Sequence, residues 1–544
     1  MVSHDHGAGG GETVRTTNTL VDPLLTDLYQ LTMAYGYWKN GTQDRAAAFD
    51  LFFRKCPFGG EFAVFAGLEQ VLRFLESFRF DDEALDYLRS LPEFSGREPG
   101  FFTWLKELDC SRLRVWAPRE GTIVFPRVPL LRVEGPLGLC QLLETTLLTL
   151  VNYPSLVTTN AARYRLAAGW DKVLLEFGLR RSQGPDGGLS ASYYSYLGGF
   201  DATSDVKAGQ LFGIPVAGTH AHAFVESFSR LSELRDRTLT DTAGMDRDFV
   251  EAVLGFRTQL GYGHTNEGEL AAFIAYALAF PDRFTALVDT YSSLESGVPN
   301  FVCVAAALLE FGYAPRGIRL DSGDLAFLSL EAKRLYARAE EVTGLALSQC
   351  RVTASNDINE AILWSLAAQT HGIDNFGIGT NLVTCEGQPA FGGVYKLVEI
   401  DGHPRVKLSE NIAKVTIPGR KVVYRLVGTD SRALVDLMVA EGEPAPTAQA
   451  PVLCRDPFDP GKMVNVVPSE VFPLLAPVWE GQRIGTAPAP ADIRRHVVGQ
   501  LRGSVRPDYL RPDNPSRYKV SVSERLYAAM HELIARESII KTIR

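Results

Sequence analysis

The sequence has no long basic segment and no long apolar segment. Its 544 residues include 55 Lys and Arg against 64 Asp and Glu, so the formal net charge is -9. A general nucleic-acid binder usually carries a basic face, so no nucleic-acid partner is expected. The most apolar run, residues 136–151, contains Gln141 and Glu144 and is shorter than a bilayer requires. We therefore expect a buried helix there and no membrane partner.

Cysteine is also scarce. The seven Cys residues form no CxxC pair, and no Cys and His residues have the spacing of a zinc site. Residues 1–18 are polar and Gly-rich and lack the apolar stretch of a secretory signal, so they are predicted to form a disordered leader. These features predict a cytoplasmic protein with reduced, mostly buried thiols.

Apolar sequence, in contrast, is sufficient for two or three domains, because 46% of the residues are hydrophobic. Within residues 19–160, Asp22 and Pro23 predict the start of a helix whose apolar face includes Leu28 and Leu31. Strands are predicted at 47–53, 113–116, 122–125 and 130–133, and a helical stretch at 62–78. These elements indicate an N-terminal α+β domain.

Between residues 161 and 395, short apolar strands alternate with helices, which is typical of parallel βα units. The predicted strands are 173–177, 214–218, 286–289, 317–320, 351–354 and 376–379, and the main helices are 301–311, 325–342 and 358–369. We therefore predict an irregular, incomplete βα barrel. Residues 396–544 are expected to pack back on the N-terminal domain, which makes the fold α/β with an α+β domain built from both ends of the chain.

Reactive or phosphate-friendly residues collect at or directly after the carboxyl end of each of the six predicted strands. They occupy positions 178–181, 219–222, 289–290, 321–324, 355–357 and 377–380. The carboxyl ends of parallel barrel strands share one rim, and barrel active sites are built there. The sequence therefore predicts that these loops converge on one site.

The stretch at 317–325 is the most informative of these. Arg319 and Asp321 are two residues apart on a strand and so face the same side, and Ser322 opens a turn with free backbone N–H groups. An Arg fork with N–H donors suits phosphate or carboxylate. A nearby carboxylate suits ribose hydroxyls or a Mg²⁺ that bridges diphosphate oxygens. The alternative is a structural Arg–Asp pair at a strand end.

Two weaker patterns belong to the same rim. Phe177 could stack on a planar heteroaromatic ring while Arg180 holds an anionic group, although a core Phe with a surface Arg has the same appearance. Gly379 and Thr380 could approach a phosphate closely, although a glycine-rich strand end without a ligand is also common.

The two histidines at 220 and 222 lie on the same side of an extended segment. That arrangement makes a metal conceivable, but no third ligand is near in sequence. A nucleophilic imidazole facing the rim fits the neighbouring phosphate features better.

Taken together, these segments resemble the nicotinate phosphoribosyltransferases, which are type II enzymes related to the nicotinamide and quinolinate phosphoribosyltransferases. The matching stretches run in family order: TDLYQLTMAYGYW (26–38), FDLFFRKCPFGGEFAVFAGL (49–68), LLETTLLTLVNYPSLVTTNAAR (142–163), GLRRSQGPDGG (178–188), YSYLGGFDATSDV (194–206), GTHAHAF (218–224), VDTYS (288–292), RLDSGDL (319–325), SNDINE (355–360), GIGTNLVTC (377–385), GGVYKLV (392–398) and SERL (523–526).

The resemblance implies an activity in NAD biosynthesis. Nicotinate would attack C1 of phosphoribosyl diphosphate to form nicotinate mononucleotide, and diphosphate would leave with the help of Mg²⁺ or Mn²⁺. ATP would be a co-substrate, hydrolysed through a phosphohistidine, in a ligase-type reaction. The family also implies a homodimer with its active site at the subunit interface.

The resemblance further implies a role for each matching residue. His222 would carry the phosphoryl group and, with Asp321 and Arg319, would be catalytic. Tyr29 of a second subunit and Phe177 would sandwich the pyridine ring. The remaining contacts to substrate would come from Thr219 and Arg319 (nicotinate), Arg180, Asp321 and Ser322 (ribose and diphosphate), Gly379 and Thr380 (5-phosphate), and Asp205.

Three positions depart from the family pattern. His220 replaces an apolar residue, Ala223 replaces Ser, and Asp205 stands where Asn is expected beside the pyridine ring. Related enzymes that use nicotinamide carry Asp in that neighbourhood, so a nicotinamide-specific enzyme is one alternative. A catalytically inactive sensor of the mononucleotide is another.

Overall fold

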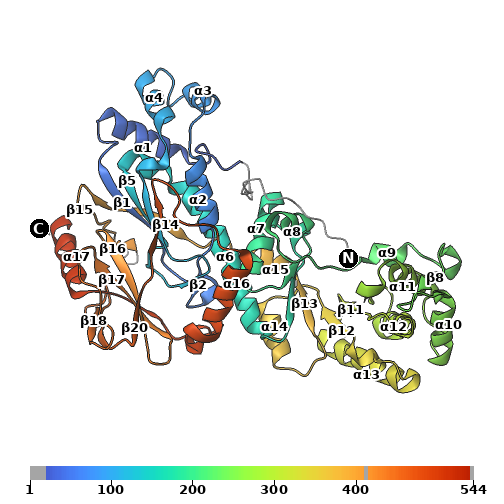
Figure 1. Ribbon diagram of the computed structural model, residues 1–544. Coiled ribbons are helices and arrows are strands. Elements are labelled where there is room, and N and C mark those ends of the chain that lie inside the picture. Colours follow the sequence, from blue (N-terminus) through green and yellow to red (C-terminus); the bar gives the residue numbers. More distant parts are fainter. Residues whose placement is uncertain (1–19, 410–413, 539–544) are drawn as a thin grey trace, which may run out of the picture. The chain divides into compact units, whose positions relative to one another are not determined.

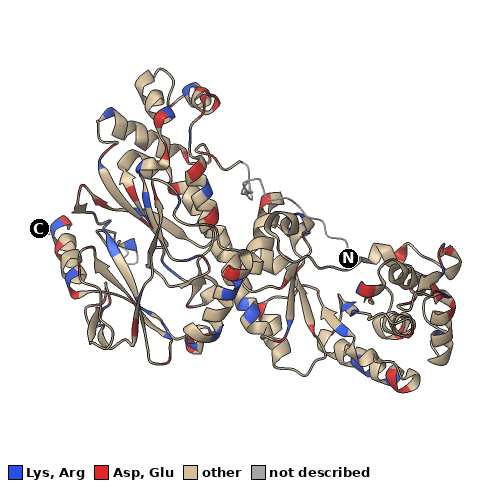
Figure 2. Ribbon diagram, viewed as in Figure 1, with Lys and Arg blue, Asp and Glu red and all other residues tan. Residues whose placement is uncertain are grey.

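The computed structural model describes residues 20–409 and 414–538, and the predicted leader at 1–18 lies outside them. The chain divides into two compact units, one formed by Met1–Leu156 with Ala390–Arg544 and the other by Val157–Pro389 (Figure 1). In Figure 2, Lys and Arg are interspersed with Asp and Glu along both units. We call them the terminal unit and the central unit. The predicted α/β fold class is confirmed.

The terminal unit contains an antiparallel six-stranded sheet made from both ends of the chain. Its strands are, in order, β15 (His403–Pro404), β14 (Gly393–Ile400), β1 (Ala46–Phe53), β5 (Leu131–Pro136), β3 (Arg114–Ala117) and β21 (Ala476–Glu480). The N-terminal strand β1 pairs with β5 on one side and with the later strand β14 on the other.

A second six-stranded sheet in this unit comes from the C-terminal segment alone. Its order is β19 (Met463–Val466), β18 (Val452–Arg455), β22 (Lys519–Val522), β17 (Ala433–Ala440), β16 (Lys421–Val427) and β20 (Glu470–Pro473). Helix α17 (Glu524–Glu537) covers it, because Leu526 and Met530 are buried against Val423 and Met438. A short ladder joins β2 (Ala63–Val64) to β4 (Ile123–Val124).

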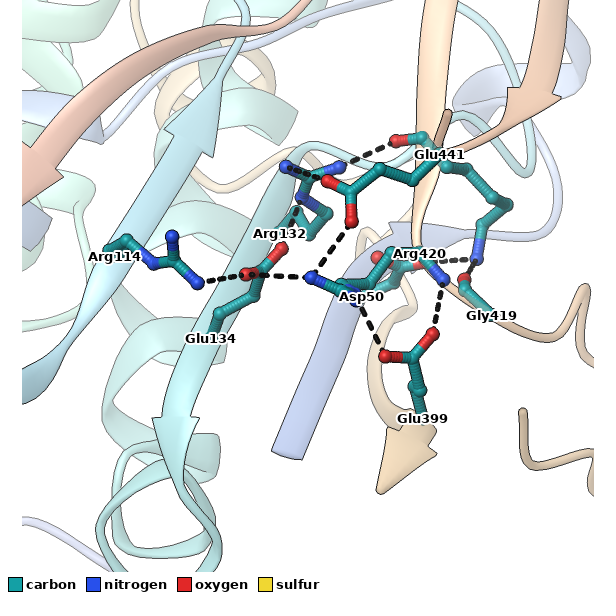
Figure 3. A network of polar contacts seen from close by, with 9 residues as sticks. Asp50, Arg114, Arg132, Glu134, Glu399, Gly419, Arg420 and Glu441 are labelled. Carbon is teal, nitrogen blue, oxygen red and sulfur yellow. Dashed lines mark hydrogen bonds and ion pairs between the residues drawn. The ribbon is translucent and has the colours of Figure 1, made fainter. Parts of the chain in front are cut away.

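A buried charge network connects the two sheets of the terminal unit (Figure 3). Asp50 on β1 pairs with the Lys421 ammonium of β16 at 2.6 Å, and both side chains are at most 3% exposed. Lys421 also donates to the carbonyl oxygens of Ile417 (2.9 Å) and Gly419 (2.7 Å). Each of the three hydrogens of the ammonium therefore has an acceptor, which makes burial of this charge tolerable.

The helices of the terminal unit correct two predictions. They are α1 (Leu28–Lys39), α2 (Leu68–Ser77), α3 (Asp82–Ser90), α4 (Pro99–Glu107), α5 (Leu137–Leu142), α6 (Glu144–Ala168, which continues into the central unit's residues), α16 (Pro490–Gly499) and α17.

The first helix starts at Leu28 and not after Asp22, because Asp27 and Gln30 form a capping box there. Residues 63–64 are a strand, since Gly67 at φ +99° starts α2 only at Leu68.

The central unit is built on a parallel six-stranded sheet, an incomplete barrel as predicted. Its order is β10 (Thr285–Leu287), β11 (Gly317–Leu320), β12 (Arg351–Ala354), β13 (Asn375–Ile378), β6 (Val173–Glu176) and β7 (Ala202–Thr203). The predicted strand at 214–218 was wrong, because it is reduced to a parallel bridge between Thr203 and Val216. Pro215 has no N–H and cannot extend the ladder on its donor side.

Helices between these strands supply the core of the central unit. They are α7 (Gly184–Leu197), α8 (Val206–Phe212), α9 (His222–Glu226), α10 (Phe249–Gln259), α11 (Glu267–Ala279), α12 (Val298–Glu310), α13 (Leu325–Thr343), α14 (Glu360–Ala367) and α15 (Thr380–Val383), with a small hairpin of β8 (Thr238–Thr240) and β9 (Asp246–Asp248). Residues 298–308 of α12 are all buried, so this helix is the centre of the core.

The apolar run at 136–151 forms α5 and the start of α6 rather than one helix. Every residue of α5 is buried, as predicted, whereas Thr149 of α6 is exposed. None of the helices in residues 20–409 and 414–538 combines the length and the apolar character needed to cross a membrane.

Candidate active site

A small pocket of about 110 Å³ lies at the carboxyl edge of the parallel sheet. It is formed by the segments that follow β6, β11, β12 and β13, and its lining residues are Phe177, Arg180, Arg181, Arg319, Asp321, Ser355, Asn356, Asp357, Gly377, Gly379 and Thr380. The structure therefore brings together six of the residues predicted from the strand ends. Three cations and two carboxylates share this small space.

Arg319, near the end of β11, is the most connected side chain in the pocket. Its Nη2 donates to the Asp321 carboxylate at 2.8 Å, its Nε donates to the Ser355 hydroxyl at 2.8 Å, and its Nη1 reaches the Thr219 hydroxyl at 3.4 Å. The guanidinium carbon also lies 5.3 Å from the Phe177 ring centroid. These contacts fix the plane of the guanidinium, which is what oriented binding of an anion requires.

His222 begins the short helix α9 and faces two carboxylates. Its Nδ1 is 3.1 Å from the Thr290 hydroxyl, and its Nε2 lies 4.0 Å from Asp289 Oδ1 and 3.9 Å from Asp321 Oδ2. The imidazole is 39% exposed, whereas the Asp289 side chain is 5% exposed. A partly exposed imidazole beside one buried and one half-buried carboxylate can accept a group delivered from solvent.

Asp289, Thr290 and Ser355 are functional-site residues to which the sequence analysis assigned no role. Their signals were a position at or directly after the end of a predicted strand, and membership of the stretches at 288–292 and 355–360. In the structure, Ser322 donates to Asp289 Oδ2 at 2.6 Å, which joins the loop after β11 to the loop after β10. The other oxygen of Asp289 is buried and has no hydrogen-bond partner among the described residues. An unsatisfied buried acceptor at a site of this kind calls for a cation or a ligand.

His220 has a different environment from His222. Its ring is 9% exposed and packs against Tyr276 at 4.8 Å between centroids, and its Nε2 accepts the Leu287 backbone N–H at 3.3 Å. Burial lowers the pKa of His220 to about 4. In the described part of the chain no group of three or more His, Cys, Asp or Glu side chains could hold a metal ion, so the two histidines do not form a metal site by themselves.

The neutral His220 should make stability fall at acid pH. The folded-state pKa of about 4 lies below the ordinary value of 6.5, so protons bind preferentially to the unfolded chain as the pH falls through this window. Preferential protonation of His220 in the unfolded chain therefore lowers the free energy of unfolding by about 2 kcal/mol at about pH 5, relative to neutral pH. Denaturant midpoints at both pH values should show that His220→Gln loses less stability on acidification than the wild type. Equal losses in the two proteins would contradict the assignment.

Asp205 lies behind the pocket and caps a helix. Its side chain is 1% exposed and accepts the N–H groups of Lys207 (2.9 Å) and Ala208 (3.1 Å) at the start of α8. The Ser192 hydroxyl connects it to Glu176, at 3.3 Å and 2.9 Å respectively. Burial raises the pKa of Glu176. Asp205, which departs from the family pattern, therefore caps α8. Its contact with a substrate stays a prediction.

Tyr29 is the one predicted site residue that lies in the terminal unit. It is in the first turn of α1 and its side chain is 46% exposed. Burial of part of the ring and the nearby Glu144 raise the pKa of its phenol. Its contact with a substrate bound to another subunit stays a prediction.

The fold and the site together define an α/β protein with a cation-rich, anion-accepting pocket at the carboxyl edge of an incomplete parallel barrel. Three family descriptions match the chain: the nicotinate phosphoribosyltransferase N-terminal domain at residues 24–152, the nicotinate phosphoribosyltransferase family at 173–437, and its C-terminal domain at 420–530. The chain belongs to the nicotinate phosphoribosyltransferase family.

Individual relatives are similar over nearly the whole chain. Nicotinate phosphoribosyltransferase 1 of Arabidopsis thaliana is 50% identical, with 99% of each chain covered. The nicotinate phosphoribosyltransferase of Homo sapiens is 48% identical, with 95% of this chain and 97% of the relative covered. The crystal structure of human nicotinic acid phosphoribosyltransferase matches with a TM-score of 0.83 at 45% identity, over 94% of this chain and 99% of that one.

Proposed function

We propose that this chain makes nicotinate mononucleotide from nicotinate and phosphoribosyl diphosphate, as a step of NAD biosynthesis from nicotinate. The pyridine nitrogen attacks the ribosyl C1, a C–N bond forms, and the C1–O bond breaks with its electron pair leaving on diphosphate. The observation that carries the proposal is the convergence of Arg319, Asp321 and Thr380 on one pocket beside His222.

In this proposal the fixed cations supply most of the rate enhancement. Negative charge accumulates on the leaving diphosphate in the transition state, and preorganised donors stabilise it without rearrangement. Arg180 lines the pocket with an exposed side chain and is free to follow the diphosphate, whereas Arg319 is held by three side chains. Gly379 and Thr380 line the opposite part, where the 5-phosphate would lie.

Phe177 supplies the aromatic surface for the pyridine ring. Its ring lies under the Arg319 guanidinium and beside Gly377, where an added Cβ would lie 2.5 Å from the Phe177 ring carbons. The absence of a side chain at Gly377 thus sets the position of the ring on which nicotinate would stack.

Gly377→Ala should therefore reduce kcat/KM for nicotinate by about 10- to 100-fold, because the displaced Phe177 ring misplaces the substrate. Gly187→Ala is a matched control, since a Cβ there would meet Gln183 at an ordinary 3.6 Å. Steady-state rates with nicotinate as the varied substrate measure the effect. A Gly377→Ala protein as active as the Gly187→Ala protein would contradict this role for the ring.

His222 is proposed to couple ATP hydrolysis to the synthesis. Nδ1 is engaged by Thr290, which leaves Nε2 to attack the γ-phosphorus. The N–P bond forms and the bond to the ADP oxygen breaks. Water later attacks the phosphorus, the N–P bond breaks, and inorganic phosphate leaves with the imidazole restored. The phosphoryl group adds negative charge and acceptor oxygens to the rim, where the Arg side chains lie.

Mg²⁺ or Mn²⁺ is proposed as the cofactor. Asp289 and Asp321 would hold it, because the unpartnered buried oxygen of Asp289 and an oxygen of Asp321 both face His222. Two carboxylates are too few for a dedicated cage, which fits an ion bound mainly through substrate phosphates. When bound, the ion neutralises charge on the diphosphate, while the two Asp residues hold it near the leaving group.

A homodimer with the active site at the subunit interface is also proposed. Leu28, Tyr29 and Met33 on α1, with Leu25 just before it, are large apolar side chains that are 38–46% exposed. An exposed apolar group of this kind is typical of an interface. Light scattering after gel filtration should give twice the mass of one chain.

One set of assays separates this proposal from its alternatives. The wild type should turn over nicotinate far faster than nicotinamide, and ATP should produce an acid-labile phosphoprotein. His222→Ala should form no such phosphoprotein and should lose the ATP-dependent part of the rate, whereas His220→Gln should retain both. Preference for nicotinamide would support the amide enzyme, and binding of the mononucleotide without turnover would support a sensor.

A further inference from the structure

A second and larger cavity lies in the terminal unit and shares no lining residue with the central pocket. Its volume is about 700 Å³, within the range of small-molecule sites. It is enclosed by the turn after β4 (residues 126–127), the hairpin of β18 and β19, and residues 517–521 at the start of β22. Every lining residue belongs to the terminal unit.

The cavity contains cations that form no close ion pair. Four lining residues are cationic, and of these Lys462 pairs with Asp459 at 2.9 Å. For the other three, Arg127, Arg517 and Lys519, no carboxylate of the described residues lies within ion-pair distance. Unpaired cations around one concave surface raise the local potential and favour an anion, even though the whole chain carries a net charge of -9.

The two carboxylates that line the cavity are already engaged by the backbone. Glu61 accepts the Tyr518 N–H at 3.0 Å. Asp456 accepts the N–H groups of Phe458 (2.9 Å) and Asp459 (3.0 Å). Arg127 feels the charge of Asp456, and Arg517 that of Glu61, although neither pair is within ion-pair distance. The lining nevertheless holds four cations against two carboxylates, which leaves a surplus of positive charge.

Arg127 is held in an unusual conformation at this cavity. Its φ of +73° is in the left-handed region that non-glycine residues rarely adopt, and its N–H donates to the Phe53 carbonyl at 2.7 Å. The guanidinium lies 4.1 Å from the Phe458 ring centroid. Burial lowers the pKa of the Arg127 guanidinium, so its charge is partly desolvated. Residues in such conformations cluster at functional sites, among them ligand-binding sites.

We propose that this cavity binds a phosphate-bearing small molecule of nucleotide size, at a site separate from the pocket beside Arg319. Two or more phosphate groups would bridge Arg127, Arg517 and Lys519, and the Phe458 side of the cavity would contact the remainder of the ligand. The chemistry fits a nucleoside triphosphate and a sugar diphosphate equally, because the cations recognise the phosphates.

Isothermal titration calorimetry on the full chain tests the proposal, with inorganic tripolyphosphate as the probe and ATP and phosphoribosyl diphosphate as parallel arms. The wild type should show two classes of tripolyphosphate site. Arg517→Gln with Lys519→Gln should weaken one class at least about tenfold and leave the other, whereas Arg319→Gln should do the reverse. Whichever of ATP and phosphoribosyl diphosphate binds more tightly to the class of site that survives in Arg319→Gln would be identified as the natural ligand.

Arg536→Gln is the matched control, because Arg536 is an exposed cation of the same unit that pairs with Glu537. It should retain both classes of site. The proposal is overturned if the Arg517 and Lys519 double variant binds like the control, or if Arg319→Gln alone removes all binding. The exposed positions of Arg517 and Lys519 make this double variant safe for folding, unlike a change at Arg127.

Discussion

Replacing Arg319 by Gln is expected to lower kcat/KM for nicotinate mononucleotide formation by about 10²- to 10³-fold, the usual effect of removing one preorganised donor from a charge-stabilising site. Gln cannot keep the bonds to Asp321 and Ser355 and also present a positive charge to a substrate. The loss should appear mainly in kcat if the guanidinium acts on the leaving group, and mainly in KM if it binds nicotinate in the ground state.

Arg351→Gln is the control for this experiment. Arg351 is an exposed residue at the first position of β12, at the edge of the same sheet opposite to the pocket. Its replacement should change kcat/KM less than about twofold, as expected for a surface position away from the reacting groups. If Arg319→Gln had the activity of Arg351→Gln, the assignment of the site would be wrong.

The second large effect is on stability. Asp50→Ala should destabilise the terminal unit by about 3–5 kcal/mol, because it leaves the Lys421 ammonium buried without a counter-charge. The shift of the denaturation midpoint, followed by circular dichroism, measures it. Lys421→Met in the same chain should recover part of the loss, since an apolar pair avoids the uncompensated charge.

An exposed ion pair of the same unit supplies the comparison. Arg45 and Asp401 join the start of β1 to the turn after β14 at 2.6 Å, with side chains 40% and 42% exposed. Asp401→Ala should shift the midpoint far less than Asp50→Ala, because solvent screens the pair. Similar midpoint shifts for Asp50→Ala and Asp401→Ala would show that the buried network in Figure 3 contributes no more than a surface contact.

Local sequence predicted the central sheet well. Strands 317–320 and 351–354 and the helix from 325 have the predicted bounds or nearly so, because each strand is a short apolar run next to turn residues, and Asp324 caps the helix. Where prediction failed, a competing local signal decided the structure. Asp27 rather than Asp22 starts α1, and Gly67 delays α2.

The sequence alone identified which residues gather at the carboxyl edge of the barrel, because parallel strands place their ends on one side whatever the details of packing. Only the tertiary structure decided what each residue contacts. Ser355 and Asp289 became partners of Arg319 and Ser322, because contacts between residues more than 30 positions apart depend on how neighbouring strands are paired in register. The cap that Asp205 forms on α8 is in contrast a local contact, with the N–H groups of Lys207 and Ala208. The burial of Lys421 against Asp50 was again decided by the tertiary structure, since no pattern in the sequence connects positions that far apart.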